Sequence, residues 1–338
     1  MPQFKIVQTS APPGAPLEQE RKGLAEFADG LVSYGNLTTP EQLIEHCHDA
    51  DALLVPGAHF TREVIDHLEH CRALVRYGVG YDTIDVPAAS DHNLVVVNIP
   101  DFCLPEVANH ALALMLDCAK KITRQDKWIR TGAWVDGGSS RAPFLSPMGP
   151  IHGETVGLVG FGQIAREFHR RLVPLDVRVI ASDPYVQAER AAALGVEIVS
   201  LEDVMRQSDY ISIHTPLLPD THHMINAAMI ALMKPTAYLI NTSRGPVVDE
   251  AALIAALQDG KIAGAGLDVF EVEPLPKDSP LMAMENVVLV PHTASYADIT
   301  FAIMHCRVGE EAARALRGQM PNTPVNPQIK PRLTWLNE

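Results

Sequence analysis

The chain has 338 residues, 47% hydrophobic and 20% charged, which is the composition of a globular protein and excludes a disordered or fibrous one. At roughly 100–200 residues per domain, this length predicts about two domains, each able to bury a core without disulfides. The formal net charge of −14 (27 Lys+Arg against 41 Asp+Glu) argues against a nucleic-acid or anionic-membrane partner.

The cysteines are odd in number, widely spaced and without a Cys-x-x-Cys pair: Cys47, Cys71, Cys103, Cys118 and Cys306. That pattern predicts reduced thiols and neither a disulfide framework nor a metal site. The amino terminus has no signal-peptide core. The most apolar helical segment, 104–122, is interrupted by polar residues including Glu106 and Asp117, so it predicts no membrane span. We therefore expect a cytoplasmic protein.

Strand and helix patterns alternate through the first hundred residues. Apolar runs typical of buried strands alternate with amphipathic stretches, which predicts a parallel sheet. The strands are expected at 4–7, 52–55, 73–77 and 94–98, and helical spacing occurs at 40–50 and 61–71.

A break at 98–101 precedes a helical pattern at 105–122 that is apolar on most faces. Such a helix is buried, either in the core or between subunits. Residues 123–150, with Trp128 and Trp134, show no clear periodicity, so we expect a long connection there. Two interpretations of it stay open, a solvated loop and a contact in a dimer.

A second alternation begins at Thr155 and predicts a second doubly wound sheet. Its strands are expected within 155–162, 177–183, 197–200, 209–214, 237–243, 264–270 and 286–292, and its helices at 163–172, 201–207, 225–233 and 249–258. A last amphipathic helix at 297–317 could pack back on the first half of the chain, which would make that domain discontinuous. The fold class expected is α/β with two doubly wound parallel sheets.

A dinucleotide fingerprint, Gly160-Phe161-Gly162-Gln163-Ile164-Ala165, follows the strand TVGLV and opens a helix. Gly160 permits the tight turn, Gly162 admits the pyrophosphate, and Ala165 allows close packing of helix and strand. Asp183 ends the next strand, where it can accept hydrogen bonds from an adenosine ribose. Because its carboxylate would repel a 2′-phosphate, we expect NAD rather than NADP.

Polar residues follow the later strands, at the sheet edge where ligands bind in doubly wound folds. Among them are Arg244, Glu273 and His292. One Arg, one acid and one His suit hydride transfer to a 2-keto acid. The Arg binds the carboxylate and polarises the carbonyl, the His supplies the proton, and the Glu orients the imidazole. Glu271 is an alternative to Glu273, and we expect His214 to be structural.

These residues and their neighbours resemble the D-isomer-specific 2-hydroxyacid dehydrogenases over about 52–316. Besides the fingerprint, the resemblance rests on GVGYDTID, HTPLLPDTHHMIN, MKPTAYLINTSRGPVVDE, GAGLDVFEVEPLP and VVLVPHTASY. It implies a Rossmann NAD-binding domain at 101–295, inserted into a flavodoxin-like substrate-binding domain formed by 1–100 and 296–338. It also implies hinges near Pro100 and Ser295 and a homodimer.

The resemblance assigns roles to single residues as well. Arg244, Glu273 and His292 would form the catalytic set, and the backbone N–H groups of Val79 and Gly80 would bind the substrate carboxylate. The residues expected to contact the cofactor are His110, Gly160, Gly162, Gln163, Ile164, Asp183, Thr215, Pro216, Thr221, Thr242 and Asp268.

Departures from the family patterns narrow the range of possible substrates. The segment 55–57 lacks the basic residues that would bind the phosphate of 3-phosphoglycerate, and Glu273 stands where formate dehydrogenases have Gln. The pattern is closest to the branch of the C-terminal-binding proteins, but Ser295 replaces their pocket tryptophan. Phe102 is expected to line the substrate pocket, and Tyr296, Phe60 and Trp335 are alternatives for an apolar wall.

The sequence thus predicts an NAD-dependent D-2-hydroxyacid dehydrogenase acting on a small 2-keto or 2-hydroxy acid. The alternative from another class is an NADH-sensing dimeric regulatory protein on the same fold. Oxidation of phosphite or another inorganic donor would use the same Glu and His and also stays open.

Overall fold

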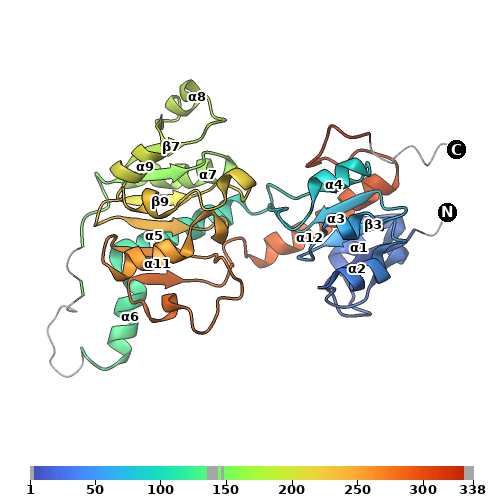
Figure 1. Ribbon diagram of the computed structural model, residues 1–338, viewed down its shortest axis with the longest axis horizontal. Coiled ribbons are helices and arrows are strands. Elements are labelled where there is room, and N and C mark those ends of the chain that lie inside the picture. The colour runs from blue at the N-terminus through green and yellow to red at the C-terminus, as the bar shows by residue number, and fades with distance from the viewer. Residues whose placement is uncertain (1–3, 135–143, 146–147, 331–338) are drawn as a thin grey trace. The chain divides into compact units, whose positions relative to one another are not determined.

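The computed structural model describes residues 4–134, 144–145 and 148–330. The chain divides into two compact units, Met1–Cys103 with Ala297–Glu338, and Leu104–Tyr296 (Figure 1). Each unit is built on its own parallel sheet. The assignment of the substrate to the first unit and the cofactor to the second stays a prediction.

The first unit contains a five-stranded sheet of order β2-β1-β3-β4-β5, with every neighbouring pair parallel. Its strands are β1 (Ile6–Gln8), β2 (Leu31–Ser33), β3 (Ala52–Val55), β4 (Ala73–Arg76) and β5 (Val95–Val97). Its helices are α1 (Glu18–Leu24), α2 (Pro40–Cys47), α3 (Arg62–Ile65), α4 (Val86–Asp91) and α12 (Asp298–Leu316), with the 3-10 turn η1 (Ala25–Gly30).

Both faces of this sheet are covered, which explains why its strands are continuous apolar runs. In β3, Leu53 and Val55 join one hydrophobic cluster, whereas Ala52 and Leu54 join another that includes Val308 of α12. Successive side chains of a strand point to opposite faces, so the two clusters lie on the two faces of the sheet. The final helix therefore belongs to the first unit, as the amphipathic pattern allowed.

The second unit contains a seven-stranded parallel sheet of order β12-β11-β10-β9-β6-β7-β8. Its strands are β6 (Thr155–Val159), β7 (Arg178–Ser182), β8 (Glu197–Ile198), β9 (Tyr210–Ile213), β10 (Tyr238–Asn241), β11 (Gly264–Leu267) and β12 (Val287–Leu289). Its helices are α5 (Leu104–Lys120), α6 (Ile122–Arg130), α7 (Gln163–Leu172), α8 (Ala188–Ala192), α9 (Leu201–Gln207), α10 (Ala227–Ile230) and α11 (Glu250–Gln258), with short turns η2 (Val173–Leu175), η3 (Pro219–Thr221), η4 (Gly245–Val247) and η5 (Pro280–Ala283).

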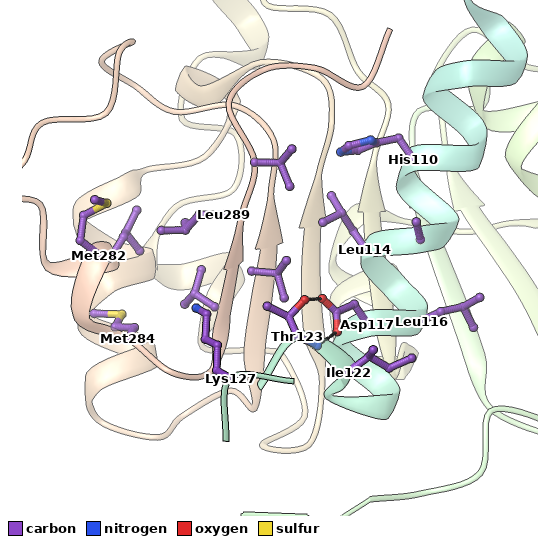
Figure 2. Close-up of a pocket in the computed structure, with 15 residues that line it drawn as sticks. His110, Leu114, Leu116, Asp117, Ile122, Thr123, Lys127, Met282, Met284 and Leu289 are labelled. Carbon is purple, nitrogen blue, oxygen red and sulfur yellow. Dashed lines mark hydrogen bonds between the residues drawn. The ribbon is translucent and has the colours of Figure 1, made fainter. Parts of the chain in front are cut away.

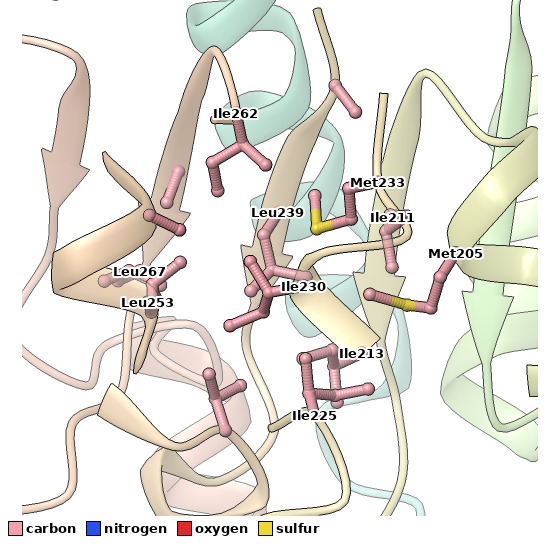
Figure 3. Close-up of a cluster of buried hydrophobic side chains, with 14 of the residues drawn as sticks. Met205, Ile211, Ile213, Ile225, Ile230, Met233, Leu239, Leu253, Ile262 and Leu267 are labelled. Carbon is pink, nitrogen blue, oxygen red and sulfur yellow. The ribbon is translucent and has the colours of Figure 1, made fainter. Parts of the chain in front are cut away.

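The strand order reverses between β6 and β9, which is the switch point of a Rossmann sheet. One face carries a cluster formed by β9 to β11 and helices α9 to α11, in which Ile211, Leu239 and Leu253 come together (Figure 3). The other face packs on α5 and α7 through residues such as Met115 and Phe168. This core holds the carboxyl ends of β6 and β9 beside each other, where a ligand crevice is expected.

The sequence interpretation was wrong over 123–130, where the expected connection forms most of the helix α6. None of its residues is buried, and only Ile122, Trp128 and Ile129 are apolar, so the sequence carries little of the burial signal that marks a helix packed on a core. The unanticipated strand β2 is only three residues long. Two parts of the expected connection, 135–143 and 146–147, lie outside the described residues.

The five cysteines are free, and four of them are buried. Among the helices described, none combines the length and the apolar character needed to cross a bilayer.

Candidate active site

The turn from β6 into α7 has the geometry of a pyrophosphate-binding loop. Gly160 has a φ of +90°, and an added Cβ would lie 2.9 Å from Thr215 Oγ1, so only glycine fits there. A Cβ at Gly162 would meet open space. The N-terminus of α7, at Gln163, has no side-chain cap, so its first N–H groups can bind an anion.

Asp183 lies directly after β7 and is tied to this loop. One carboxylate oxygen accepts the N–H of Phe161 at 2.8 Å, and the other accepts that of Tyr185 at 2.9 Å. The remaining lone pairs of this half-buried carboxylate can still accept hydroxyl hydrogens. Its place at the end of the second strand of the Rossmann unit is the position suited to ribose.

The loops after β9 and β10 are joined by threonine and serine hydroxyls. Thr215 Oγ1 donates to the carbonyl of Val159 at 2.9 Å, and Ser243 Oγ donates to the carbonyl of Thr215. Thr221 Oγ1 donates to the carbonyl of Pro216 at 2.6 Å. These contacts place Thr215, Pro216 and Thr221 in one loop beside the fingerprint.

Asp268 is fully buried at the end of β11 and organises the next strand end. Its carboxylate accepts the N–H groups of Thr293 (2.8 Å) and Ala294 (2.9 Å), and its carbonyl accepts that of His292 at 2.8 Å. Burial raises the pKa of Asp268, and the two N–H groups and His110 offset this only in part. His110 Nε2 lies 3.5 Å from Asp268 Oδ1.

Glu273 and His292 form a close pair in which Nδ1 lies 2.6 Å from Oε2. The other oxygen of Glu273 accepts the N–H of Phe270 at 3.0 Å. Burial works to raise the pKa of Glu273, but the His292 hydrogen bond, the Phe270 N–H and the charge of Arg244 outweigh it and lower that pKa. The carboxylate therefore stays ionised and leaves His292 Nε2 as the atom able to exchange a proton with a ligand.

Arg244 follows β10 and is brought to this pair by a tight backbone contact. A Cβ on Gly245 would lie 1.9 Å from the carbonyl carbon of Phe270, so the NTSRG segment can pack against the 270–273 turn only with glycine there. Asn241 Nδ2 donates to the Arg244 carbonyl at 2.9 Å and fixes the end of the strand. A cation, a carboxylate and an imidazole thus lie together at the carboxyl edge of the sheet.

The structure brings the predicted residues together in two sets. All those assigned to catalysis and cofactor lie in the second unit, whereas Val79, Gly80 and Phe102 lie in the first. There the carbonyl of Val79 accepts Asn98 Nδ2 at 2.7 Å, and a Cβ on Gly78 would lie 3.9 Å from the Phe102 ring. Of the alternative walls, Phe60 is fully buried in the core, Tyr296 is exposed, and Trp335 lies outside the described residues.

Sequence reasoning missed the partner of Glu271, which is His223 at 2.7 Å. The two glutamates of the 271–273 turn therefore contact different histidines, and no local sequence pattern predicts these pairs. His214 Nε2 contacts Ser212 Oγ at 2.9 Å, and burial lowers the pKa of His214 to about 3, as suits a neutral packing residue. No group of three potential metal ligands occurs within the part of the chain that the structure describes.

The donor set of the second unit fits a nicotinamide dinucleotide. Open space faces Gly162 at an uncapped helix N-terminus. Thr242 Oγ1 and His110 Nε2 are buried and have no hydrogen-bond partner among the described residues, so each is available to a polar ligand group.

A groove of about 480 Å³ begins at His110 and follows α5, between that helix and the edge strand β12 (Figure 2). Its walls are mostly apolar, with Leu114 and Leu116 on α5 and Met282 and Met284 opposite them. Thr123 and Lys127 of α6 line it as well.

Comparisons with known proteins show which family this chain is similar to. Residues 112–294 match the model of the D-isomer specific 2-hydroxyacid dehydrogenase, NAD binding domain. A glyoxylate reductase of Korarchaeum cryptofilum is 38% identical over 288 residues, 85% of this chain and 86% of that protein. A D-3-phosphoglycerate dehydrogenase of Methanocaldococcus jannaschii is 37% identical over 91% of this chain, which spans only 56% of the length of that relative.

Solved structures are similar along almost the whole chain. The NADPH-dependent glyoxylate/hydroxypyruvate reductase of Sinorhizobium meliloti, in complex with NADP and malonate, superposes with a TM-score of 0.82 at 30% identity, covering 96% of this chain and 97% of that one. The TT0316 protein of Thermus thermophilus gives a TM-score of 0.82 at 31% identity and covers 95% of this chain and all of that one. Both similarities support the two-domain α/β fold.

Proposed function

The chain belongs to the D-isomer specific 2-hydroxyacid dehydrogenase family, and from that premise we propose that it reduces a small 2-keto acid to the D-2-hydroxy acid with NADH. The observation that carries the proposal is the Glu273–His292 pair with Arg244 beside it. A binding protein would need neither an oriented imidazole nor a cation at the same strand edge.

NADH, when bound, supplies the hydride. Gly160, Gly162, Gln163 and Ile164 would hold the pyrophosphate, and Asp183 the ribose. The remaining cofactor contacts are assigned to His110, Thr215, Pro216, Thr221, Thr242 and Asp268. A carboxylate at 183 with no arginine in the residues just after it favours NAD over NADP, although relatives that use NADPH share the fold.

Arg244 would bind the substrate carboxylate and polarise the carbonyl, with further N–H groups from Val79 and Gly80 and an apolar wall from Phe102. His292 Nε2 then gives its proton to the carbonyl oxygen as the hydride reaches the carbon. Glu273 holds Nδ1 and stabilises the imidazolium before the transfer. In the oxidative direction His292 must start neutral, so the two directions have different pH optima.

The substrate is proposed to be glyoxylate, hydroxypyruvate or an acid of similar size, as the names of the relatives suggest. Phosphoglycerate is disfavoured because the segment 55–57 carries no basic side chain. Placement in the branch of the C-terminal-binding proteins stays a prediction.

We further propose a homodimer in the cytoplasm, where thiols stay reduced. The groove beside α5 is lined by two exposed apolar side chains, Ile122 of α6 and Met282 of η5. An apolar surface of this kind typically lies in a protein–protein contact, and a second copy of the chain is the occupant that the resemblance implies.

The test is NADH oxidation by the purified protein with glyoxylate, hydroxypyruvate, pyruvate, phenylpyruvate and branched 2-keto acids, with NADPH in parallel. We expect turnover of a small acid with NADH, and a loss of about 10²–10⁴-fold in His292→Ala and Arg244→Ala with NADH binding retained. Tight NADH binding without turnover of any acid would instead support the regulatory protein or an inorganic donor.

A further inference from the structure

We propose that Glu271 and His223 form a second histidine–carboxylate pair that positions Arg244 and Glu273 without touching the substrate. The inference rests on the proposed function, because it concerns the same active site. Both residues are partly exposed, and His223 Nε2 lies 2.7 Å from Glu271 Oε1. Neither residue belongs to the catalytic set.

Glu271 connects three segments of the chain through its contacts. Its Oε1 accepts the Glu250 N–H at 3.0 Å and lies 2.7 Å from His223 Nε2, and its own N–H donates to Glu250 Oε2 at 3.1 Å. Glu250 is the first residue of α11. The carboxylate therefore ties the 270–273 turn, which carries Glu273, to the start of a helix and to the segment after Thr221.

The same segments enclose the η4 turn, at which Arg244 is the N-cap residue. The His223 N–H donates to the Pro246 carbonyl at 2.8 Å, and the Ile225 N–H donates to the Val247 carbonyl at 3.1 Å. On the other side, the backbone of Phe270 and Glu271 lies against Gly245. Glu271, His223 and the backbone beside them thus enclose the turn next to Arg244. We call this arrangement the clamp.

His223 has a φ of +49°, in the left-handed region that a non-glycine residue adopts only at an energetic cost. Such a conformation persists where the surroundings over-determine it. Here the backbone hydrogen bond to Pro246 and the contact of the ring with Glu271 both hold the conformation of His223. The conformation places the ring against Glu271 while the main chain pairs with η4.

Removing the Glu271 carboxylate leaves the Glu250 N–H without its acceptor and the His223 ring without its carboxylate partner, so Arg244 and Glu273 lose a shared support. Misplacement of catalytic groups by about 1 Å can cost up to about 100-fold in rate. The dinucleotide loop between Gly160 and Ala165 is not part of the clamp, so NADH affinity should be preserved.

The experiment compares Glu271→Ala, Glu271→Gln and His223→Ala with the wild-type protein in steady-state kinetics. We expect Glu271→Ala to lower kcat/KM for the 2-keto acid about 10- to 100-fold, with the Kd of NADH within about two-fold. Glu271→Gln keeps an acceptor oxygen and should recover most of the rate. Asp66→Ala, which breaks the comparable His92–Asp66 pair (2.7 Å) in the first unit, is the control and should leave kcat/KM unchanged.

Hydrogen exchange at 243–248 and 269–273 gives a readout that needs no turnover. Faster exchange in Glu271→Ala and His223→Ala, but not in Asp66→Ala, supports the clamp. Unchanged exchange, or a kcat/KM for Glu271→Ala within about two-fold of wild type, overturns it. If the wild-type protein reduces no 2-keto acid, the proposed function fails, and exchange alone decides whether the clamp exists.

Discussion

Glu271 and Glu273 lie two residues apart on one turn, and each contacts a different histidine. Glu273 is the member whose surroundings suit proton transfer, because Arg244 and His292 both stabilise its charge. The lowered pKa of Glu273 means that it is ionised throughout the neutral range and down to acidic pH. The role that we propose for it is therefore to stabilise the imidazolium and not to give up a proton itself.

Glu273→Gln tests this role. The variant keeps an oxygen that can accept from His292 Nδ1 but lacks the negative charge that stabilises the imidazolium, so the reductive rate should fall. We expect kcat to fall on the order of 10- to 100-fold at neutral pH. The measurement is kcat for NADH oxidation by the variant and the wild-type protein. A kcat within about two-fold of wild type would contradict the role.

At the scale of elements, the contact between α1 and α12 is made by two glycines. A Cβ on Gly23 would lie 2.0 Å from the carbonyl oxygen of Cys306, and one on Gly309 would lie 2.3 Å from that of Glu20. The backbones therefore touch. This contact brings His305 Nδ1 to 2.7 Å from the buried carboxylate of Glu20, which also accepts the Tyr77 hydroxyl at 2.9 Å.

Gly309→Ala should separate the two helices, since the blocking atoms are backbone and cannot rotate away. We expect a loss of about 1–3 kcal/mol in the free energy of unfolding. Gly57→Ala is the matched control in the same unit, because a Cβ there meets nothing within 4 Å, and it should be neutral or slightly stabilising. Urea unfolding of both variants checks the difference. Equal midpoints for Gly309→Ala and wild type would refute the close contact.

At the scale of the whole molecule, the proposed dimer contact involves both α5 and α6, which line the same groove. The helix α5 packs its buried face on the second sheet, as Leu114 and Met115 show. The helix α6 buries none of its residues in the chain and exposes Ile122 at the groove. A partner over the groove would cover both the edge strand β12 and this side chain.

Ile122→Asp combined with Met282→Asp should shift the protein from twice the chain mass to the mass of a single chain. Both side chains are exposed, so the charge should not unfold the chain. Val173→Asp, at an exposed apolar site away from the groove, is the control. Light scattering coupled to gel filtration measures the mass. A double variant that stays at the wild-type mass would place the dimer contact elsewhere.

The sequence alone was enough to predict every strand except β2, the long helices and the residues at the strand ends. Strands covered on both faces appear as apolar runs, so the pattern located β3 and α7 at the residues found in the structure. The fingerprint and Asp183 were also predictable, because turn geometry and ligand chemistry restrict the residue types within one short segment.

The contacts between side chains of distant segments could be seen only in the tertiary structure. His223 and Glu271 are 48 residues apart along the chain, and the sequence around neither residue predicts their contact. The contact of Gly245 with Phe270 likewise depends on how β10 and β11 lie side by side. The helix α6 was missed because its apolar residues are few and exposed. Local patterns record burial, whereas pairings across the sheet depend on the path of the whole chain.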